Sequence, residues 1–320
     1  MAGADNIYEI ALIQMFAEVM ILKKILVLMA TYNGEKFIKQ QLDSVYGQKD
    51  VYVSVLVRDD GSTDGTIEIL KEYSNSHELE WYANGHLGVK YGFYELMQKA
   101  ALREWDYVAF CDQDDVWDED KLITAVNRLN NTDLCQPSLY YCGQRLVDIN
   151  LNMISNHLLN RDRSIYARFL LNDAAGCTEV FNRKLLEVVI SYRPEYMLMH
   201  DAWIVKVCLA LGGSVVVDSD AHMSYRQHGN NVVGLKRDIL SKIRQAKYYI
   251  YEQDVVSQMK ELKKGYYDRI IPEYKSIVDD TLIYKNSLAA RKRLIDKTRI
   301  NYSDRGLQIT YWLKVMMNKL

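Results

Sequence analysis

The stretch YVAFCDQDDVW, residues 107–117, runs from an apolar segment directly into a cluster of acids. Its first four residues are typical of a buried β-strand. Three aspartates follow within four positions, at Asp112, Asp114 and Asp115. Like charges this close raise one another's pKa, so the cluster is unfavourable without a compensating partner. The stretch therefore predicts a binding site at the end of a strand, with a solvated acidic turn that caps the next helix as the alternative.

Two further apolar runs, at residues 24–30 and 51–59, are similar in length to the run at 106–112. Continuous apolar runs of this kind are typical of strands buried on both faces, as in parallel sheets. Helical patterns lie after each run, at residues 35–48, 64–73 and 90–103. This alternation predicts an α/β fold with a mostly parallel sheet flanked by helices. No G-x-G-x-x-G motif follows the first strand, which argues against a dinucleotide-binding fold.

The remainder of the chain is expected to form two regions. Residues 166–190 have the pattern of a helix, a strand and a second helix, residues 200–213 predict an amphipathic helix, and residues 214–220 predict a short strand. From residue 235 onward, apolar residues recur at helical spacing between lysines and arginines. We therefore expect an N-terminal extension over residues 1–23, a Rossmann-like α/β domain over residues 24–234, and a basic, mostly helical region over residues 235–320.

The composition is that of an ordinary globular protein, with 320 residues, 49% of them hydrophobic and 26% charged. The five cysteines show no C-x-x-C spacing and are expected to be buried thiols in a reducing compartment. The apolar segment at residues 7–22 contains two glutamates, so an amphipathic helix is expected there rather than a membrane span. No signal peptide is evident, and the sequence predicts a cytoplasmic protein.

Polar side chains follow all three predicted strands. Because the carboxyl ends of parallel strands meet at one rim of a sheet, where ligands of such folds bind, these side chains are expected to form one site. They are Thr31, Tyr32, Asn33, Asp59, Asp60, Asp112, Asp114 and Asp115.

A divalent cation would explain how the third group of acids is tolerated. In an extended segment Asp112 and Asp114 point the same way, and two converging carboxylates are costly unless a cation lies between them. Mn²⁺ or Mg²⁺ suits oxygen ligands and readily bridges to a diphosphate. Asp118, Glu119 and Asp120 are instead predicted to form the first turn of the next helix, where negative charge complements the helix dipole.

These segments resemble glycosyltransferase family 2, whose members have the GT-A fold. The resemblance is carried by ATYNGEKFIKQQLDSV (30–45), RDDGSTDGT (58–66) and FCDQDDVW (110–117), and then by AGCTEVFNR (175–183), MHDAW (199–203) and YRQHGNNVVG (225–234). Within this family, the segments most resemble those of bacterial rhamnosyltransferases of cell-wall and O-antigen polysaccharide synthesis. The resemblance covers residues 24–234 and leaves the basic region outside it.

The resemblance implies which residues would hold the nucleotide. The nucleobase and ribose would be lined by Thr31, Tyr32 and Asn33. Asp59 would accept a hydrogen bond from the base N3–H, and Asp60 would support that loop. The sequence departs from the family pattern at residues 84–90, so donor contacts from that loop, including any from Lys90, are in doubt.

The resemblance also implies roles around the diphosphate. Asp112 would hold the ribose and Asp114 would bind the metal. Asp115 would back up the metal or touch the donor sugar. Arg226 would bind the nucleotide-sugar and His228 would bind the metal, by contacts to the diphosphate or to the cation. An equally open alternative is that His228 is an ordinary surface histidine.

Asp201 would be the general base of the family's reaction. A positioned carboxylate can take the proton of an acceptor hydroxyl, and one base with direct displacement predicts inversion at the anomeric carbon. The alternative is that Asp201 is only the N-cap of the helix that follows. His200 is expected to support Asp201 through a hydrogen bond.

The basic region has a charge opposite to that of the rest of the chain. Residues 235–320 carry 19 Lys and Arg against 10 Asp and Glu, whereas residues 1–234 carry 21 against 32. Basic helices with aromatic residues suit an anionic membrane surface. The alternative is a helical subdomain that packs on the enzyme or forms a homo-oligomer. No recognition motif supports nucleic-acid binding.

The expected activity is therefore a metal-dependent, inverting glycosyl transfer. The donor would be dTDP-L-rhamnose, and the acceptor would be a lipid-linked or oligosaccharide hydroxyl of a growing bacterial surface polysaccharide. The enzyme would work in the cytoplasm or on the inner face of the cell membrane. Two alternatives remain open, namely a UDP-hexose donor and a non-catalytic nucleotide-sugar-binding protein held at a membrane.

Overall fold

The computed structural model describes residues 22–160, 162–227 and 253–320. Three sequence-based expectations lie outside these residues: the helix over residues 7–22 apart from its last residue, the boundary near residue 234, and His228 as a metal ligand. Most of the predicted helical stripe after residue 235 also lies outside them.

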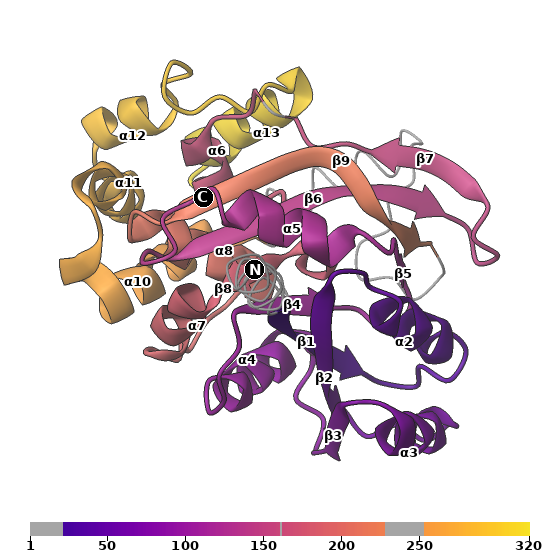
Figure 1. The fold of residues 1–320 in the computed structure, drawn as a ribbon. Helices are drawn as coiled ribbons and strands as arrows, with labels where there is room; N and C mark the ends of the chain where they lie inside the picture. Colours follow the sequence, from indigo (N-terminus) through magenta and orange to yellow (C-terminus); the bar gives the residue numbers. More distant parts are fainter. Residues whose placement is uncertain (1–21, 161, 228–252) are drawn as a thin grey trace, which may run out of the picture.

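One mixed sheet forms the centre of the molecule (Figure 1). Its strand order is β3-β2-β1-β4-β8-β6-β9-β5, and β7 pairs with β6. The first half is parallel and contains β1 (Lys23–Thr31), β2 (Val51–Asp59), β3 (Leu79–Ala83) and β4 (Tyr107–Cys111). The three strands predicted from apolar runs are confirmed, and they end within one residue of the expected positions.

The second half of the sheet introduces antiparallel pairs. Strand β8 (Val180–Asn182) runs antiparallel to both β4 and β6 (Ser138–Val147), and β7 (Met153–His157) and β5 (Val116–Trp117) are antiparallel to β6 and β9 respectively. Strand β9 (Ser214–Arg226) is parallel to β6 and extends six residues beyond the predicted strand. This half carries polar residues and glycine within its strands, which is why its sequence gave a weaker signal.

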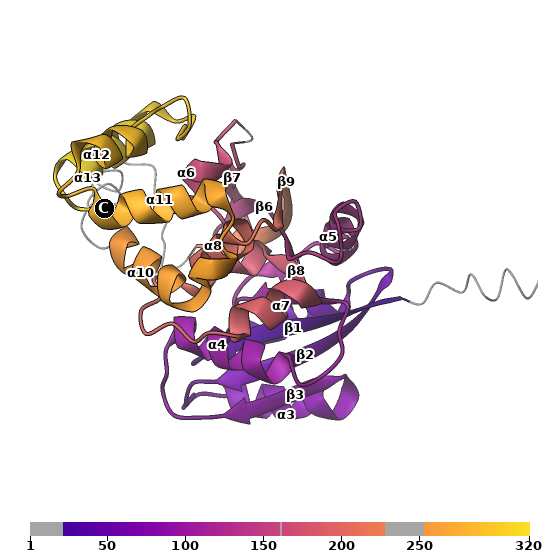
Figure 2. The ribbon, with the colours of Figure 1, turned by 90° about the vertical axis from the view of Figure 1, so that its left-hand side faces the viewer.

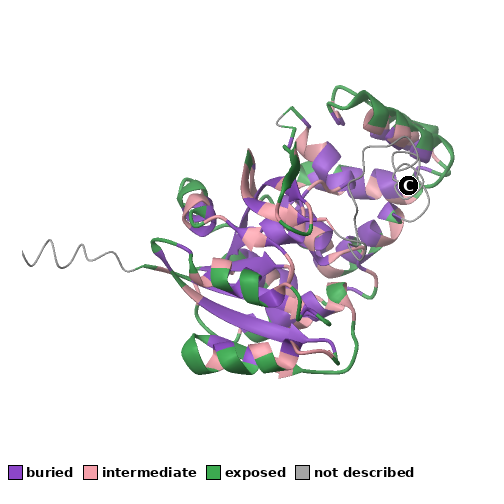
Figure 3. Cartoon of the chain, turned by 90° about the vertical axis from the view of Figure 1, so that its right-hand side faces the viewer, coloured by how far each residue is buried: buried purple, intermediate pink, exposed green. Residues whose placement is uncertain are grey.

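Helices cover both faces of the sheet, as the continuous apolar runs predict (Figures 2 and 3). In β1, Leu26 and Leu28 belong to one buried core, whereas Val27 and Met29 belong to the other. The first core includes α4 (Val89–Ala100), α7 (Arg183–Ile190) and α8 (His200–Ala210), and the second includes α2 (Ile38–Tyr46), α3 (Thr66–Ser76) and α5 (Lys121–Leu129). The result is a three-layer α/β/α arrangement.

The C-terminal helices pack on the α8 side of the α/β domain (Figure 2). They are α10 (Val255–Tyr266), η3 (Tyr267–Arg269), α11 (Pro272–Ile283), α12 (Leu288–Leu294) and α13 (Arg305–Met316), and α6 (Ile165–Leu170) lies in the same core. The backbone N–H of Ile271 donates to the carbonyl of Ala210 at 2.9 Å, and Ser164 donates to Asn301 at 2.7 Å. The described part of the basic region therefore packs on the α/β domain. No helix within the described residues is both long and apolar enough to cross a bilayer.

The predicted position of the acids at residues 118–120 is wrong. Helix α5 begins only at Lys121 and has no acid in its first turn. Asp118 instead forms a two-pronged ion pair with the guanidinium of Arg145, with one N···O distance of 2.7 Å. Its backbone N–H also donates to His222 at 3.1 Å, which continues the β5–β9 pairing. A long-range ion pair thus outweighs the local preference for the helix dipole.

Candidate active site

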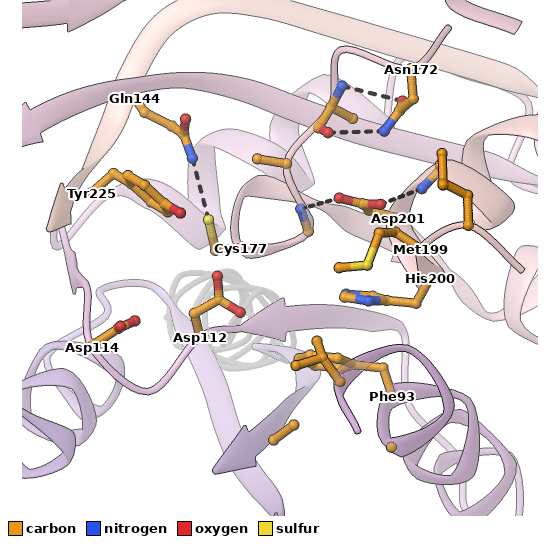
Figure 4. A pocket seen from close by; sticks show the side chains of 18 of the residues that line it. Phe93, Asp112, Asp114, Gln144, Asn172, Cys177, Met199, His200, Asp201 and Tyr225 are labelled. Carbon is orange, nitrogen blue, oxygen red and sulfur yellow. Dashed lines mark hydrogen bonds between the residues drawn. The ribbon is translucent and has the colours of Figure 1, made fainter. Parts of the chain in front are cut away.

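A cleft of about 1380 Å³ opens at the carboxyl ends of β1, β2 and β4 (Figure 4). Helices α4 and α8, the start of α13 and residues 172–177 line other parts of the cleft. Eight residues that the sequence singled out line this cleft: Thr31, Tyr32, Asn33, Asp60, Asp112, Asp114, His200 and Asp201. Three others, Asp59, Asp115 and Arg226, do not line it, although each is a sequence neighbour of a residue that does.

Gln113 ties the loop after β1 to the loop after β4, a role that sequence reasoning missed. Its amide oxygen accepts from the hydroxyl of Thr31 at 2.5 Å and from the backbone N–H of Tyr32 at 3.0 Å. Its amide nitrogen donates to the carbonyl of Tyr32 at 3.1 Å. Asn33, which has φ 48°, accepts from the N–H of Thr63 at 2.8 Å and so connects this loop to the loop after β2. The three loops are therefore held together before any ligand arrives.

The two aspartates after β2 have exchanged their expected positions. The carboxylate of Asp59 is 1% exposed and accepts from the N–H groups of Gly61 at 3.0 Å and Ser62 at 2.8 Å. Asp60, in contrast, lines the cleft. The physical reason is the sharp turn at Gly61, where φ is 95°, because this turn directs the first carboxylate inward onto its own backbone.

The carboxylate of Asp60 is surrounded by hydrogen-bond donors and lies beside the buried Arg58. It accepts from the N–H groups of Leu87 at 3.0 Å and Gly88 at 2.9 Å, and it lies 2.8 Å from Nδ1 of His86. Burial raises the pKa of Asp60, but these N–H donors and the Arg58 guanidinium outweigh burial and hold the pKa below its usual range. Asp60 therefore presents a stable negative charge to the cleft. Lys90 is not among the residues that line it.

The acids after β4 include two that meet beside a thiol. Asp112 and Asp115 place carboxylate oxygens within 4.8 Å of one another and of Sγ of Cys177. Asp115 is fully buried and accepts from the backbone N–H of Arg226 at 3.1 Å. Burial, with the charges of Asp114 and Asp201, raises the pKa of Asp112 to about 7.

The donor set fits a hard divalent cation. Within the described residues, Oδ2 of Asp115 is buried and has no hydrogen-bond partner, which is the condition a metal would relieve. Carboxylate oxygens are the ligands that Mg²⁺ and Mn²⁺ prefer. Burial raises the pKa of the Cys177 thiol and outweighs the opposite effect of Gln144, which donates to the sulfur at 3.4 Å, so this group stays neutral. The carboxylates, and not the thiol, are the suitable ligands.

The buried side chain of Arg226 supports the acidic loop, residues 112–115. Its guanidinium donates to the carbonyl of Asp114 at 2.8 Å, the carbonyl of Ile149 at 2.6 Å and the side chain of Gln40 at 2.7 Å. The side chain is 2% exposed. Arg226 therefore positions the backbone of Asp114. Its expected contact with a diphosphate or a metal stays a prediction.

Asp201 stands opposite these acids, at the start of α8 (Figure 4). The N-cap of α8 is Met199, so the interpretation of Asp201 as the N-cap is wrong. Its carboxylate accepts from the N–H of Gly176 at 3.2 Å and from the N–H of Ala202 at 2.5 Å. Burial raises the pKa of Asp201 to about 6 against the effect of these two donors. A carboxylate with this pKa is ionised at neutral pH and still basic enough to take a proton.

Lys121 is a second residue that sequence reasoning missed. It follows three acids in the sequence and is fully buried. Its ammonium donates to the carbonyl of Cys177 at 2.6 Å and lies 3.2 Å from the centre of the Trp117 ring. The partner carbonyl lies 56 positions further along the chain. No local pattern could have indicated this contact.

Comparison with solved structures identifies the fold as the GT-A fold of glycosyltransferases. The structure of TarS from S. aureus in complex with UDP-GlcNAc has a TM-score of 0.57 at 17% identity, covering 93% of this chain and 82% of that chain. The mannosyltransferase PcManGT from Pyrobaculum calidifontis, in complex with GDP-Man and Mn²⁺, has a TM-score of 0.56 at 18% identity, covering 94% and 88%.

Sequence comparison defines the family. The family model of glycosyl transferase family 2 matches residues 26–190. The dTDP-rhamnosyl transferase RfbG of Shigella flexneri is 31% identical over 220 residues, which are 64% of this chain and 73% of that protein. The glucosyltransferase WfgD of Escherichia coli, which uses UDP-Glc, is 29% identical over 164 residues, 50% of this chain and 60% of that protein. The chain belongs to glycosyltransferase family 2 and is a glycosyltransferase.

Replacing Asp201 by Asn should stabilise the protein at pH 8. Because the folded state holds the Asp201 proton more tightly than the unfolded chain does, the contribution of this group to stability falls as the pH rises from about 4 to about 6. The variant removes that penalty, so its free energy of unfolding at pH 8 should exceed that of the wild type by about 1 to 3 kcal/mol. Urea unfolding at a series of pH values measures the difference.

The advantage of the variant should shrink as the pH falls toward 4, where wild-type Asp201 is protonated in both states. Asp268→Asn, at an exposed carboxylate, is the matched control and should leave the free energy of unfolding nearly unchanged. Equal stability of Asp201→Asn and the wild type at pH 8 would contradict a desolvated Asp201 carboxylate.

Proposed function

We propose that the protein is a metal-dependent, inverting glycosyltransferase that moves L-rhamnose from dTDP-L-rhamnose to a hydroxyl of a growing bacterial surface polysaccharide. The observation that carries this proposal is the placement of Asp201 in one cleft with Asp112, whose carboxylate lies close to that of the buried Asp115. The 31% identity to the dTDP-rhamnosyl transferase RfbG supports the donor. The catalytic unit would be residues 24–234, with residues 235–320 as its helical partner.

The nucleotide would lie on the β1–β2 side of the cleft. Thr31, Tyr32 and Asn33 would line the base and ribose there, and the exchange described above makes Asp60 the carboxylate that faces the base. Asp59 would only hold the turn that shapes this end. Solved structures of similar fold contain UDP-GlcNAc and GDP-Man, which supports a nucleotide-sugar as donor.

Asp112, Asp114 and Asp115 would hold Mn²⁺ or Mg²⁺. When bound, such a cation neutralises the charge that develops on a departing diphosphate. Asp114 lines the cleft, and its backbone is held by the Arg226 guanidinium, so its carboxylate is presented to the ligand from a fixed position. Mn²⁺ in the similar mannosyltransferase structure supports a divalent metal here.

Asp201 would act as the base. Its two backbone hydrogen bonds fix the carboxylate, and its pKa of about 6 leaves it ionised at neutral pH. It would take the proton of the acceptor hydroxyl as that oxygen attacks the anomeric carbon from the face opposite the diphosphate. The bond to the acceptor forms as the bond to the diphosphate breaks, which inverts the configuration.

A UDP-hexose donor is the second candidate. The relative WfgD uses UDP-Glc, and the TarS structure contains UDP-GlcNAc. The two donors differ in the base methyl and in the sugar, and they would occupy the same cleft. A catalytically silent nucleotide-sugar-binding protein is the third candidate, and an ionised Asp201 in the cleft argues against it.

Donor and metal dependence should be visible in a thermal-shift screen. With Mn²⁺, dTDP-L-rhamnose should raise the melting temperature more than UDP-glucose or GDP-mannose does, because a ligand that binds only the folded state stabilises it. Asp114→Ala should remove the Mn²⁺-dependent part of this shift. Asp120→Ala, at an exposed acid of the same segment that does not line the cleft, should keep it. A larger shift with UDP-glucose would favour the second candidate.

Asp201→Asn should abolish transfer without abolishing donor binding. Loss of a general base typically lowers turnover on the order of a thousandfold, whereas the donor contacts lie elsewhere in the cleft. The readout is release of the nucleoside diphosphate in the presence of acceptor, together with the donor-induced thermal shift. Wild-type turnover should fall as the pH drops below about 6, because Asp201 becomes protonated. Unchanged turnover in the variant would refute the role of Asp201.

We also propose that α13 rests on an anionic membrane surface, where a lipid-linked acceptor would be found. Ile309, Trp312, Leu313 and Met316 are each 38 to 52% exposed and recur at helical spacing on one face. Residues 253–320 carry 14 Lys and Arg against 8 Asp and Glu, a charge that complements anionic lipid. Thr310 of the same helix lines the cleft, so the apolar face lies next to the site.

Vesicle co-sedimentation tests this surface. The wild type should bind vesicles that contain phosphatidylglycerol and should bind phosphatidylcholine vesicles much less. Replacing both Ile309 and Trp312 by Ser should lower the fraction of protein bound to the vesicles several-fold, because their apolar area no longer enters the membrane interface. Leu102→Ser, at a side chain that is 84% exposed, is the control. If the wild type remains in the supernatant, or if the wild type is a dimer that dissociates in the double variant, the exposed face of α13 would instead be a contact of a homo-oligomer.

A further inference from the structure

His200 is a buried polar side chain that the mechanism above does not use. It is the first residue of α8 and is 3% exposed, yet it lines the cleft beside Asp201. Within the described residues, neither ring nitrogen has a hydrogen-bond partner. The expectation that His200 supports Asp201 is therefore wrong, because backbone N–H groups bind that carboxylate instead. Burying a polar group without a partner is unfavourable, so the position requires an explanation.

The imidazole ring is held on three sides (Figure 4). It stacks on Phe93 with ring centroids 4.0 Å apart and an interplanar angle of 18°. It meets Phe110 edge to face at 4.8 Å. A Cβ atom added to Gly176 would lie 2.6 Å from Nε2, so only glycine permits the observed approach. The ring is therefore fixed in one orientation against the wall of the cleft.

The chemistry of the ring restricts what it can bind. Burial lowers the pKa of His200 to about 3, so the imidazole is neutral and offers one N–H donor and one acceptor nitrogen. A neutral ring gives no charge attraction to a diphosphate. No described metal-ligating group includes His200. A hydroxyl group, which both donates and accepts, matches a neutral imidazole.

The ring lies between two parts of the site, and this position indicates which hydroxyl group it would bind. On one side, Gly92 and Phe93 belong to α4, which begins directly after the Gly88 N–H that binds Asp60 on the nucleotide side. On the other side lies Asp201, the proposed base. A sugar attached to the diphosphate would occupy the space between them.

We propose that His200 is a sugar-binding residue that hydrogen-bonds a hydroxyl of the transferred sugar and thereby contributes to the choice of donor. This inference rests on the proposed function, because it requires a nucleotide-sugar in the cleft. Phe93 and the close approach of Gly176 hold the imidazole in place at the wall of the subsite that a pyranose ring would occupy. The nucleotide itself would not touch His200.

The test separates the sugar from the nucleotide. Binding of dTDP and of dTDP-L-rhamnose is measured by calorimetry with Mn²⁺, and UDP with UDP-glucose serves as the second pair. In the wild type the nucleotide-sugar should bind more tightly than the nucleotide. His200→Phe keeps the stacked ring but removes both nitrogens, and it should bind the sugar form about tenfold more weakly while binding the nucleotide unchanged. His200→Asn, which keeps one donor and one acceptor, should recover part of the loss.

A purely structural histidine would give the opposite pattern. His200→Phe would then keep the full advantage of the nucleotide-sugar over the nucleotide, and this result would overturn the inference. Thermal unfolding of both variants is measured first, and Gly176→Ala, which pushes on the ring from its other side, provides an independent variant that should show the same selective loss. If the wild type itself shows no preference for either nucleotide-sugar, the proposed function fails rather than the role of His200.

Discussion

The geometry of the cleft depends on one short turn, η1 (Gly176–Thr178), which is anchored from two sides. The N–H of Gly176 donates to Asp201, and the carbonyl of Cys177 accepts from the buried ammonium of Lys121. Lys121 is shielded from water, so its charge acts strongly over short distances, and it lowers the pKa of Asp112 against the effect of burial. Removing this anchor would weaken the link between the base and the acidic cluster, because both contacts meet on this one turn.

The turn reaches this position because the sheet changes direction. Strand β8 runs antiparallel to β4, so the start of β8 lies beside the end of β4. The N–H of Phe110 donates to the carbonyl of Glu179 at 3.2 Å, which continues this pairing up to the site. A further parallel strand would have brought its carboxyl end to the same rim and would have needed a long crossover connection. The antiparallel strand instead delivers η1, and with it Cys177, directly against Asp112 and Asp115.

The parts of the site that follow from strand ends could be predicted, and the parts that follow from long-range contacts could not. The apolar runs located β1, β2 and β4, and the rim rule then placed Asp112 in the cleft, whereas Asp201 was expected there only from the family resemblance. Whether Asp59 or Asp60 faces that cleft depends on the turn at Gly61, which no periodicity describes. Residues 138–147 and 153–157 gave no clear strand pattern because polar residues interrupt them, so their sheet half was not anticipated.

Three residues with unsatisfied buried groups lie at or near this cleft. Oδ2 of Asp115, both carboxylate oxygens of Glu179 and both ring nitrogens of His200 lack partners within the described residues. Burial, with the nearby charge of Asp201, raises the pKa of Glu179 well above its usual range, so this carboxyl stays neutral and adds no repulsion. Each unpartnered group lowers the stability of the ligand-free protein. A ligand that supplies the missing hydrogen-bond partners recovers that free energy on binding. The unpartnered groups therefore both lower the stability of the empty cleft and strengthen the binding of its substrates.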